Sequence, residues 1–337
     1  MSQAITFPQA LQQFAVSMAA HGLTPPSELQ ADGRIHRFST NGKRSDTAGG
    51  YVLHCDDIAA GAFWDWRTGL YSTWCSLDRE TMPTAQRHAF EQRMALHHAQ
   101  AKRDRTAALR KNRARMDVLW AESVPVTPGD PVHTYLRGRG LELRSVPEVL
   151  RLHRALDYWD FDADGSPIKR GTYPAMLAAV QIEEFPDGHN RPGVLTTVAL
   201  HRTYLTSAGE KADVPNVKKL TGTAGDMRGA AIRLAPAAVM DGCYRLGVAE
   251  GIETALAAAE GSGVPTWATV SASGMKTFKW PRLPHELYLF ADNDANETGQ
   301  KAALELARKA QACGLAVHTL VPPTPGCDWA DVWKARH

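Results

Sequence analysis

The sequence lacks paired cysteines, long apolar runs and a secretion-type N-terminus. Its five cysteines are odd in number, and none stands in CxxC spacing. That pattern excludes a disulfide framework and a zinc ribbon. His54, Cys55 and Cys75 lack a fourth ligand at metal-binding spacing, so buried free thiols are the simpler interpretation. No apolar run reaches the length of a membrane span, and we expect a cytoplasmic protein without a membrane partner.

A strong charge of one sign is also missing. The 337 residues carry a formal net charge of +2 at pH 7, with 44% hydrophobic and 22% charged residues, which is the composition of an ordinary globular protein. A GxxxxGKS or GxxxxGKT loop is absent as well, because GTAGDMRG lacks the lysine and SASGMKT has a methionine between its glycine and lysine. The chain therefore carries no nucleotide-driven motor of that type.

The pattern along the chain predicts four segments of an α/β and α+β multidomain protein. A β-rich module comes first, then a basic helical connector, an α+β segment and a small doubly wound α/β unit, with predicted ranges 1–78, 79–124, 125–238 and 239–337. The connector has no glycine, and its only proline stands near its start, which favours one long helix or a helical pair. The PVTPGDP stretch that follows it is the clearest linker.

Short β-like runs in residues 32–74 mix cations with aromatic side chains. The cationic set is Arg34, His36, Arg37, Lys43, Arg44 and Arg67, and the aromatic set is Phe38, Trp64, Trp66 and Trp74. Such a mixture suits single-stranded nucleic acid, because phosphates need positive charge and unstacked bases need a stacking face. Tryptophans that form the core of a small module explain the aromatic set equally well, whereas the Lys43–Arg44 turn favours binding.

Basic residues continue through the connector and into the middle segment. The connector helix either lies along a phosphate backbone or is a solvated spacer between domains. In the middle segment, four cations lie near the ends of predicted strands: Arg202, Lys211, Lys218 and Lys219. Positive charge along one face of a sheet suits a triphosphate or a template backbone, and an edge strand protected by lysine is the alternative.

Apolar runs alternate with helical patterns from Asp241 onward, which predicts a parallel sheet with helices on both faces. One run ends at Glu250, where Gly251 is expected to permit a tight turn into a helix, and another ends at Asp292 and Asp294. The carboxyl ends of parallel strands meet at one edge, so we expect these carboxylates to lie together. Carboxylates suit a hard divalent cation such as Mg²⁺, and the pattern indicates phosphoryl transfer.

This pattern resembles the Toprim domain, a metal-binding unit of bacterial-type primases, type IA and type II topoisomerases and some nucleases. Glu250 matches the glutamate motif of that family and Asp292–Asn293–Asp294 its DxD motif, while SASGM at 271–275 resembles a loop of bacterial primases. The resemblance implies a small doubly wound parallel sheet with Mg²⁺ or Mn²⁺ held by the aspartates. It implies that Glu250 is a metal ligand or a general acid or base.

The upstream segments resemble other parts of primases. YLRGRGL, and HRTYL followed by VPNVKKLTG, look like the basic α+β subdomain that precedes Toprim in those enzymes. Basic residues of that subdomain, at the positions of Arg202, Lys218 and Lys219, contact template and nucleotide. The further binding candidates are Lys211, Arg137 and Arg139, together with Lys43 and Arg44 of the β-rich module. DGRIHRFSTNGKRSD resembles the N-terminal segment of primase-like proteins from phages, plasmids and integrated elements.

The chain departs from the family pattern in two respects. The zinc ribbon of cellular primases is absent, so template recognition would rest on the β-rich module. The further aspartate or glutamate that some Toprim sites contribute is not evident from the motifs, and the candidates for it are Glu297, Asp328 and Asp331. Lys276 is a further basic candidate for the site.

The C-terminal CDWADVW also resembles the tail of mobile-element primases. A helix N-cap at Asp328, with Trp329 and Trp333 packed as anchors, explains the same residues more simply.

The leading hypothesis is a DNA primase that synthesises short RNA primers on single-stranded DNA for replication of a mobile element. It implies Mg²⁺ or Mn²⁺ as cofactor, NTPs and a single-stranded DNA template as partners, and a separate replicative helicase. A Toprim-type nuclease and a non-catalytic nucleic-acid-binding replication subunit are the alternatives. A topoisomerase is disfavoured, because the chain is too short for a strand-passage gate.

Overall fold

The structure is a computed structural model that describes residues 6–42, 46, 48–55, 58–65, 68–77, 84–143, 145–162, 166–184, 193–281 and 285–336, with part of the side chains in 84–101 left out. The chain divides into two compact units, residues 1–103 and 104–337, and each is treated by itself. In the part of the chain that is described, no helix is both long and apolar enough to cross a membrane.

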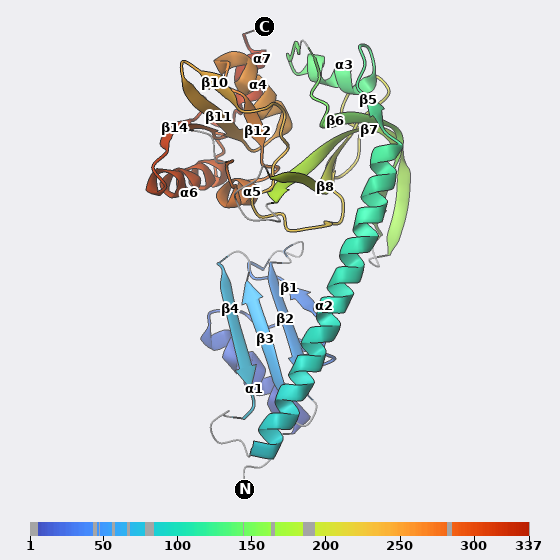
Figure 1. Cartoon of the computed structure of the whole chain (residues 1–337). Helices are drawn as coiled ribbons and strands as arrows, with labels where there is room; N and C mark the ends of the chain where they lie inside the picture. Colours follow the sequence, from blue (N-terminus) through green and yellow to red (C-terminus); the bar gives the residue numbers. More distant parts are fainter. Residues whose placement is uncertain are drawn as a thin grey trace. The chain divides into compact units, whose positions relative to one another are not determined.

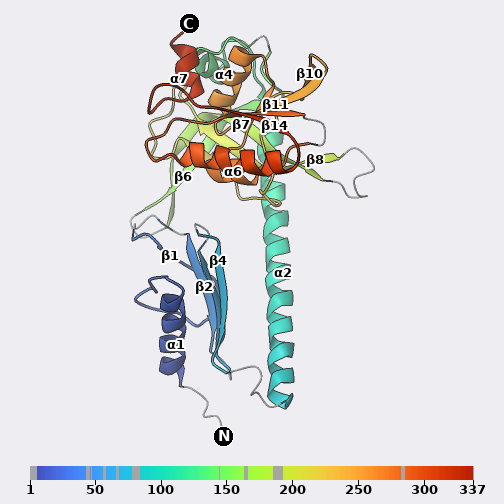
Figure 2. The same ribbon diagram turned by 90° about the vertical axis from the view of Figure 1, so that its left-hand side faces the viewer.

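The first unit is one helix packed on an antiparallel meander (Figures 1 and 2). Helix α1 spans Phe7–Ala20, and its N-terminus is closed by a capping box between Thr6 and Gln9. The strands follow in chain order and pair with their neighbours: β1 (His36–Phe38), β2 (Gly49–His54), β3 (Ala60–Asp65) and β4 (Leu70–Cys75).

Aromatic side chains form the core of this unit. Phe14 of α1 is fully buried and contacts Tyr51, Phe63 and Trp74, with ring centroids 5.6 to 6.0 Å apart. Trp64 is also buried, with 7% of its surface exposed. Trp64 is therefore a packing residue in this unit, and Trp74 packs against its core. Lys43, Arg44, Trp66 and Arg67 lie outside the described residues.

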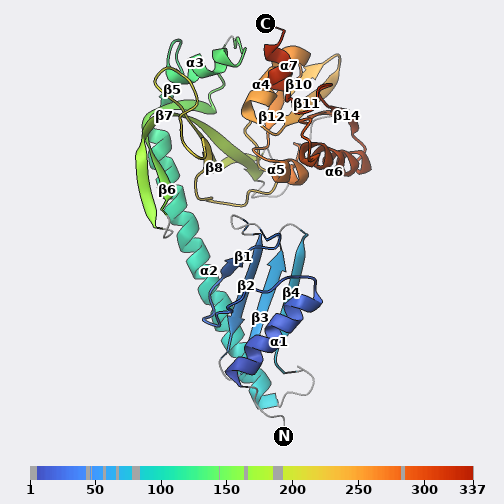
Figure 3. The same cartoon turned by 180° about the vertical axis from the view of Figure 1, so that it is seen from behind.

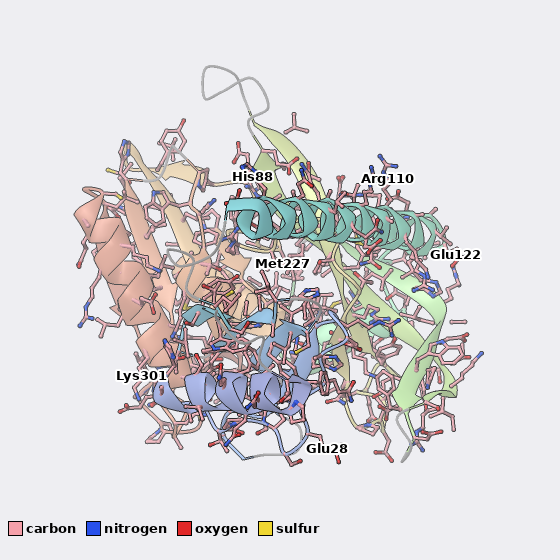
Figure 4. All side chains as sticks on the ribbon, turned by 90° about the horizontal axis from the view of Figure 1, so that it is seen from below. Glu28, His88, Arg110, Glu122, Met227 and Lys301 are labelled. Atoms are coloured by element: carbon pink, nitrogen blue, oxygen red, sulfur yellow. The ribbon has the colours of Figure 1, made fainter. Side chains whose placement is uncertain are left out.

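Helix α2 (Thr84–Ala121) is a single helix of 38 residues, so of the two predicted forms the chain adopts the single helix. Charged and polar side chains such as His88 and Arg110 are exposed on it (Figure 4). A helix that is polar on all sides gains little from burial until it meets a core. That happens in the second unit, where Met116 is buried near the C-terminal end of the helix.

The second unit begins with a five-stranded antiparallel sheet in chain order. Its strands are β5 (Val124–Pro125), β6 (Leu150–Phe161), β7 (Pro167–Glu184), β8 (Val194–Tyr204) and β9 (Lys218–Leu220). One face packs against the end of α2 through Met116, Tyr158 and Tyr204. The opposite face packs against α3 (Pro131–Gly138) and α4 (Ile252–Ser262), so neighbouring residues along each strand meet different partners.

The C-terminal part is a small doubly wound sheet, as the sequence predicts. Its strands are β10 (Ala238–Met240), β11 (Cys243–Ala249), β12 (Thr266–Ala268), β13 (Glu286–Phe290) and β14 (Ala316–Leu320). The four parallel strands lie in the order β12, β11, β13, β14, and β10 pairs antiparallel with the beginning of β11.

Helices cover both faces of this sheet. Helices α4 and α7 (Trp329–Lys334) cover one face, and α5 (Ala272–Thr277) and α6 (Thr298–Ala312) cover the other (Figures 1 and 3). The fold is thus the mixed α/β and α+β arrangement that the sequence predicts.

Backbone hydrogen bonds join the two sheets of the second unit. Ala231 exchanges two of them with Gln181 of β7, and the next residue, Ile232, exchanges two with Ala268 of β12. A continuous apolar cluster runs from the antiparallel sheet into α4 beside this connection. The position of the antiparallel sheet against the parallel one is therefore fixed by pairing as well as by packing.

A substitution of Phe14 tests the assignment of the aromatic core in the first unit. The substitution Phe14→Ala should destabilise that unit by about 3–5 kcal/mol, because it removes a fully buried ring and leaves a cavity. Urea unfolding followed by tryptophan fluorescence measures the loss, since Trp74 lies against this ring. Phe7→Ala, at a residue that is 55% exposed, is the matched control and should change stability by less than about 0.5 kcal/mol. Equal effects of the two substitutions would refute the assignment of the core.

Candidate metal and nucleic-acid site

The strand order brings the predicted acids together. The chain leaves β11 towards β12 on one side, and β13 and β14 lie on the other side, so the crossovers diverge between β11 and β13. In open parallel sheets such a switch point forms a crevice at the carboxyl ends of the strands. Glu250 follows β11 directly, and Asp292 stands two residues after β13.

A cavity of about 220 Å³ lies at this crevice, and it carries acids together with cations. The charged and polar side chains that line it are Glu250, Asp292, Asp328, Arg139, Lys211, Lys218, Tyr135, His201, Glu253 and Thr254. They come from the antiparallel sheet, α3, α4 and the segments that follow the parallel strands. All of them belong to the second unit.

One carboxylate oxygen of the half-buried Asp292 is unsatisfied. Its Oδ1 is buried and has no hydrogen-bond partner among the described residues. Burial, followed by the charges of Asp328, Glu250 and Asp294, raises the pKa of Asp292 to about 7. Burial and the charge of Asp294 also raise the pKa of Glu250, although the Ala272 backbone N–H donates to that carboxylate. Acids held in this way favour a bound cation.

The donor set fits a hard divalent ion. Among the described residues, no three His, Cys, Asp or Glu side chains converge as a closed metal cage. Mg²⁺ is usually bound by one or two carboxylates together with water and substrate phosphates, so a closed cage is not required. Asp292 and Glu250 place carboxylates in the cavity that would hold such an ion, and Asp294 adds negative charge beside them.

The residue between the two aspartates holds the loop in place. Asn293 Nδ2 donates to the Pro322 carbonyl oxygen (2.8 Å), and its Oδ1 accepts from Gln300 Nε2 (3.1 Å). Its backbone N–H donates to the carbonyl of Cys327 (3.1 Å). The anchored Asn293 fixes the loop that carries Asp292 and Asp294.

Gly251 has a different role from the one predicted. Its φ of −94° and ψ of 158° are extended, so the turn into α4 does not require glycine for a left-handed conformation. A Cβ there would lie 3.3 Å from Thr254 Oγ1 and 3.6 Å from Glu253 Oε2. The glycine therefore leaves room for the first turn of α4 beside the cavity.

Lys218 is held by a buried carboxylate. Its Nζ donates to Glu253 Oε2 (2.8 Å), and Tyr135 Oη donates to Glu253 Oε1 (2.6 Å). Burial alone would raise the pKa of Glu253, but the charge and hydrogen bond of Lys218 and the hydrogen bond of Tyr135 outweigh it and lower that pKa to about 2. Burial and the Glu253 charge raise the pKa of Tyr135. The three side chains join β9, α4 and α3.

The sequence interpretation places Arg202, Lys218 and Lys219 on one wall that faces the acids, and the structure corrects this for Arg202 and Lys219. Side chains alternate along a strand, so Lys219 points to the face opposite Lys218. Its Nζ donates to the Trp159 carbonyl (2.6 Å) and lies 4.0 Å from the centre of the Tyr158 ring. Arg202 pairs with Lys219 across the sheet and donates to the Leu220 carbonyl (2.7 Å). Of the three, Lys218 alone lines the cavity.

Arg139, which follows α3, and Asp328, which precedes α7, also line the cavity. Arg139 Nη2 lies 3.4 Å from Asp331 Oδ1 and 3.9 Å from Asp328 Oδ2. Asp328 caps α7 by accepting from the Asp331 backbone N–H (2.8 Å). The N-cap interpretation of the tail is therefore confirmed, and the anchors are also present, since Trp329 packs on Phe290. The capping side chain still lines the cavity and contributes to the raised pKa of Asp292.

Three other candidates lie outside the cavity. Arg137 lines a separate hollow beside α3. Lys276 Nζ lies 3.5 Å from Glu305 Oε2, on the side of α5 and α6. Glu297 stands exposed before α6, with one oxygen 3.2 Å from Lys301 Nζ.

Sequence reasoning missed Tyr135, Glu253 and His201. Glu253 stands three residues after Glu250, so it shares a helix start with that motif, but nothing in the sequence pairs it with Lys218. His201 is 7% exposed, and burial, with the charge of Lys218, lowers its pKa to about 4. The imidazole is therefore neutral at pH 7, and the cations that line the cavity are Lys218, Lys211 and Arg139.

Lys218 should stabilise the fold through Glu253. Lys218→Met leaves a buried carboxylate without its counter-charge and should cost about 2–3 kcal/mol, less than a fully buried pair because Lys218 is 41% exposed. The folded-state pKa of Glu253 is depressed from 4.5 to about 2. Its stabilising effect is therefore present above about pH 4.5 and lost as the pH falls towards 2.

Urea unfolding of the wild type and Lys218→Met between pH 2.5 and 7 measures this difference. The difference in the free energy of unfolding between the two proteins should be largest at pH 7 and should decrease below pH 4.5. Lys219→Met is the matched control, because the contacts of Lys219 with described residues are to a carbonyl and an aromatic ring, so the loss of stability in this variant should not depend on pH. A gap that stays constant with pH would show that Glu253 is not held ionised by Lys218.

Comparisons with known proteins agree with the geometry. The Toprim domain family matches residues 245–337, and a family described as a domain of unknown function (DUF7146) matches residues 110–234. Among curated proteins, none matches this chain.

Solved primase structures show a distant similarity. A DNA primase domain from Pseudomonas aeruginosa is 17% identical, with 60% of this chain and 66% of that chain covered and a TM-score of 0.36. A DnaG primase catalytic domain bound to single-stranded DNA is 13% identical, with 70% and 78% covered and a TM-score of 0.40. The Aquifex aeolicus primase is 12% identical, with 99% and 83% covered and a TM-score of 0.37. The chain spans just under two thirds of the Pseudomonas structure.

The family match and the fold agree on the same residues. The matched range contains the doubly wound sheet and the three acids Glu250, Asp292 and Asp294 at its strand ends. Residues 245–337 of this chain are therefore a Toprim domain.

Proposed function

We propose that the protein is a primase that synthesises short RNA primers on single-stranded DNA, in the replication of a mobile element. The observation that carries the proposal is the cavity in which the Toprim acids Glu250 and Asp292 meet the cations Lys218, Lys211 and Arg139. Nucleotidyl transfer needs both kinds of charge, because a triphosphate must be neutralised while its phosphorus is attacked.

The acids of the cavity and Lys218 have separate roles in this proposal. Asp292 and Glu250, with Asp294 beside them, hold a divalent cation, Mg²⁺ or Mn²⁺, which supplies charge neutralisation at the triphosphate when bound. Lys218, fixed by Glu253, binds a phosphate oxygen of the incoming nucleotide. If the aspartates alone hold the cation, the Glu250 carboxylate is free to accept the proton of the attacking 3′-hydroxyl as pyrophosphate leaves.

The remaining basic residues differ in position. Lys211 and Arg139 also line the cavity and are proposed to bind phosphates of template or nucleotide. Arg202 and Lys219 lie on the opposite face of the antiparallel sheet and would contact nucleic acid only outside the cavity. Any helicase that opens duplex DNA ahead of the enzyme would be a separate protein.

The small size of the cavity favours a metal-dependent nuclease as the second candidate function. At about 220 Å³ the cavity lies below the range of about 300–1,000 Å³ that is typical of small-molecule sites. A single phosphodiester needs less room than a whole nucleoside triphosphate. Cleavage of labelled single-stranded DNA or RNA without added NTPs would favour this candidate over primer synthesis.

Primer synthesis on defined single-stranded templates tests the proposal. The full chain with NTPs and Mg²⁺ or Mn²⁺ should produce short oligoribonucleotides. Glu250→Gln and Asp292→Asn should each lower the yield by about 100-fold or more, because each removes a ligand of the cation and leaves the fold intact. Gel electrophoresis of labelled products measures the yield.

The matched control is Asp117→Asn, the same change at an exposed acid on α2. It should leave synthesis within about twofold of the wild type. Absence of product from the wild type under all these conditions would contradict the proposal and favour the nuclease or a non-catalytic nucleic-acid-binding subunit. Equal loss in the control would contradict the assignment of the acids.

A further inference from the structure

A second and larger cavity lies on the other side of the parallel sheet. It measures about 540 Å³ and is formed by the end of β7, the segment that joins the two sheets, the residues from Lys276 to Pro281, and the end of α6. It shares no lining residue with the acid-lined cavity. Helices α5 and α6 lie side by side there (Figures 1 and 3).

Positive charge dominates this cavity. Four cations line it, Arg233, Lys276, Lys279 and Lys309, against one acid, Glu183. The nearby Glu305 pairs with Lys276 (3.5 Å) and Lys309 (2.9 Å). Among the described residues Lys279 has no ion pair within 4 Å, and Asp226, on which its charge also acts, is paired with Arg228 (2.7 Å), so the cavity keeps an excess of positive charge.

Two features hold the cations in position. The Arg233 guanidinium lies 4.4 Å from the centre of the Trp267 ring, its Nη2 donates to Glu183 Oε2 (3.2 Å), and its buried Nε has no partner among the described residues. Gly229 has a φ of +89°, and a Cβ there would lie 2.8 Å from Cγ and Cδ of Lys279. The glycine thus lets the lysine stem lie across the backbone at the edge of the cavity.

Aromatic rings supply the apolar part. Phe278 is buried and Trp280 is half-buried, and both line the cavity beside Lys279. A cavity that combines cations with aromatic faces matches a ligand that has an anionic end and a flat ring. Its volume lies within the range of about 300–1,000 Å³ that is typical of small-ligand sites.

We propose that this cavity binds a nucleotide, with the phosphate at Lys279 and Arg233 and the base against Trp280. Two sources carry the same chemistry, namely a free mononucleotide and one nucleotide unit of a single strand. The site is independent of the divalent cation, because its charge comes from lysine and arginine. Binding in this cavity therefore does not require the acids of the other cavity or the divalent cation.

Binding to the full chain in EDTA tests the proposal, since removal of divalent ions separates this site from the acids. The probes are AMP and 5′-phosphorylated oligo-dT of five residues, titrated by calorimetry and by the change in tryptophan fluorescence. Lys279→Glu should weaken binding of the preferred probe at least tenfold, and Trp280→Leu should weaken it and remove most of the fluorescence change.

Arg308→Glu is the matched control, because Arg308 is an exposed cation of α6 outside the cavity, and it should change affinity less than twofold. Asp292→Asn should also leave affinity within twofold. Tighter binding of AMP identifies a free-nucleotide site, and tighter binding of the oligonucleotide identifies a strand site. Absence of binding by either probe, or equal losses in Lys279→Glu and Arg308→Glu, would overturn the proposal. Thermal unfolding of each variant shows that the comparison is made on folded protein.

Discussion

The buried carboxylate of Glu253 is the interaction on which the second unit depends. It lies at the start of α4 and accepts hydrogen bonds from Tyr135 of α3 and Lys218 of β9. Without these partners it would carry a large desolvation penalty, so folding of the parallel sheet is coupled to the position of the basic edge strand. Apolar packing between the sheets is non-directional, whereas this charged contact selects which lysine enters the cavity.

The cavity therefore contains carboxylates of two kinds. Glu253 is satisfied within the protein, and its pKa is lowered. Asp292 is not satisfied, and its pKa is raised by burial and by neighbouring acids. Uncompensated acids reduce stability, and such groups gather at functional sites because a ligand compensates them. In the proposed enzyme, Glu253 would fix Lys218 for a phosphate group, and Asp292 would hold the metal ion.

The sequence predicted the parts that follow from local pattern. Apolar runs that stop at Glu250 and Asp292 specified parallel strands whose ends meet, and the Asp328 N-cap followed from capping rules. It did not predict which lysine faces the acids, because Lys218 and Lys219 differ only by the alternation of a three-residue strand whose register is set by β8. Nor did it predict the contact between Glu253 and Tyr135, which are 118 residues apart. Such pairs are decided by tertiary packing.

The central claim is that the acids at the strand ends bind a divalent cation. Calorimetric titration of Mn²⁺ into the full chain, without nucleotide, tests it most directly. The account predicts a saturable site in the wild type and in Asp117→Asn, and at least about tenfold weaker binding in Asp292→Asn, which loses a ligand in the cavity. Equal Mn²⁺ affinity in the wild type and Asp292→Asn would contradict the account.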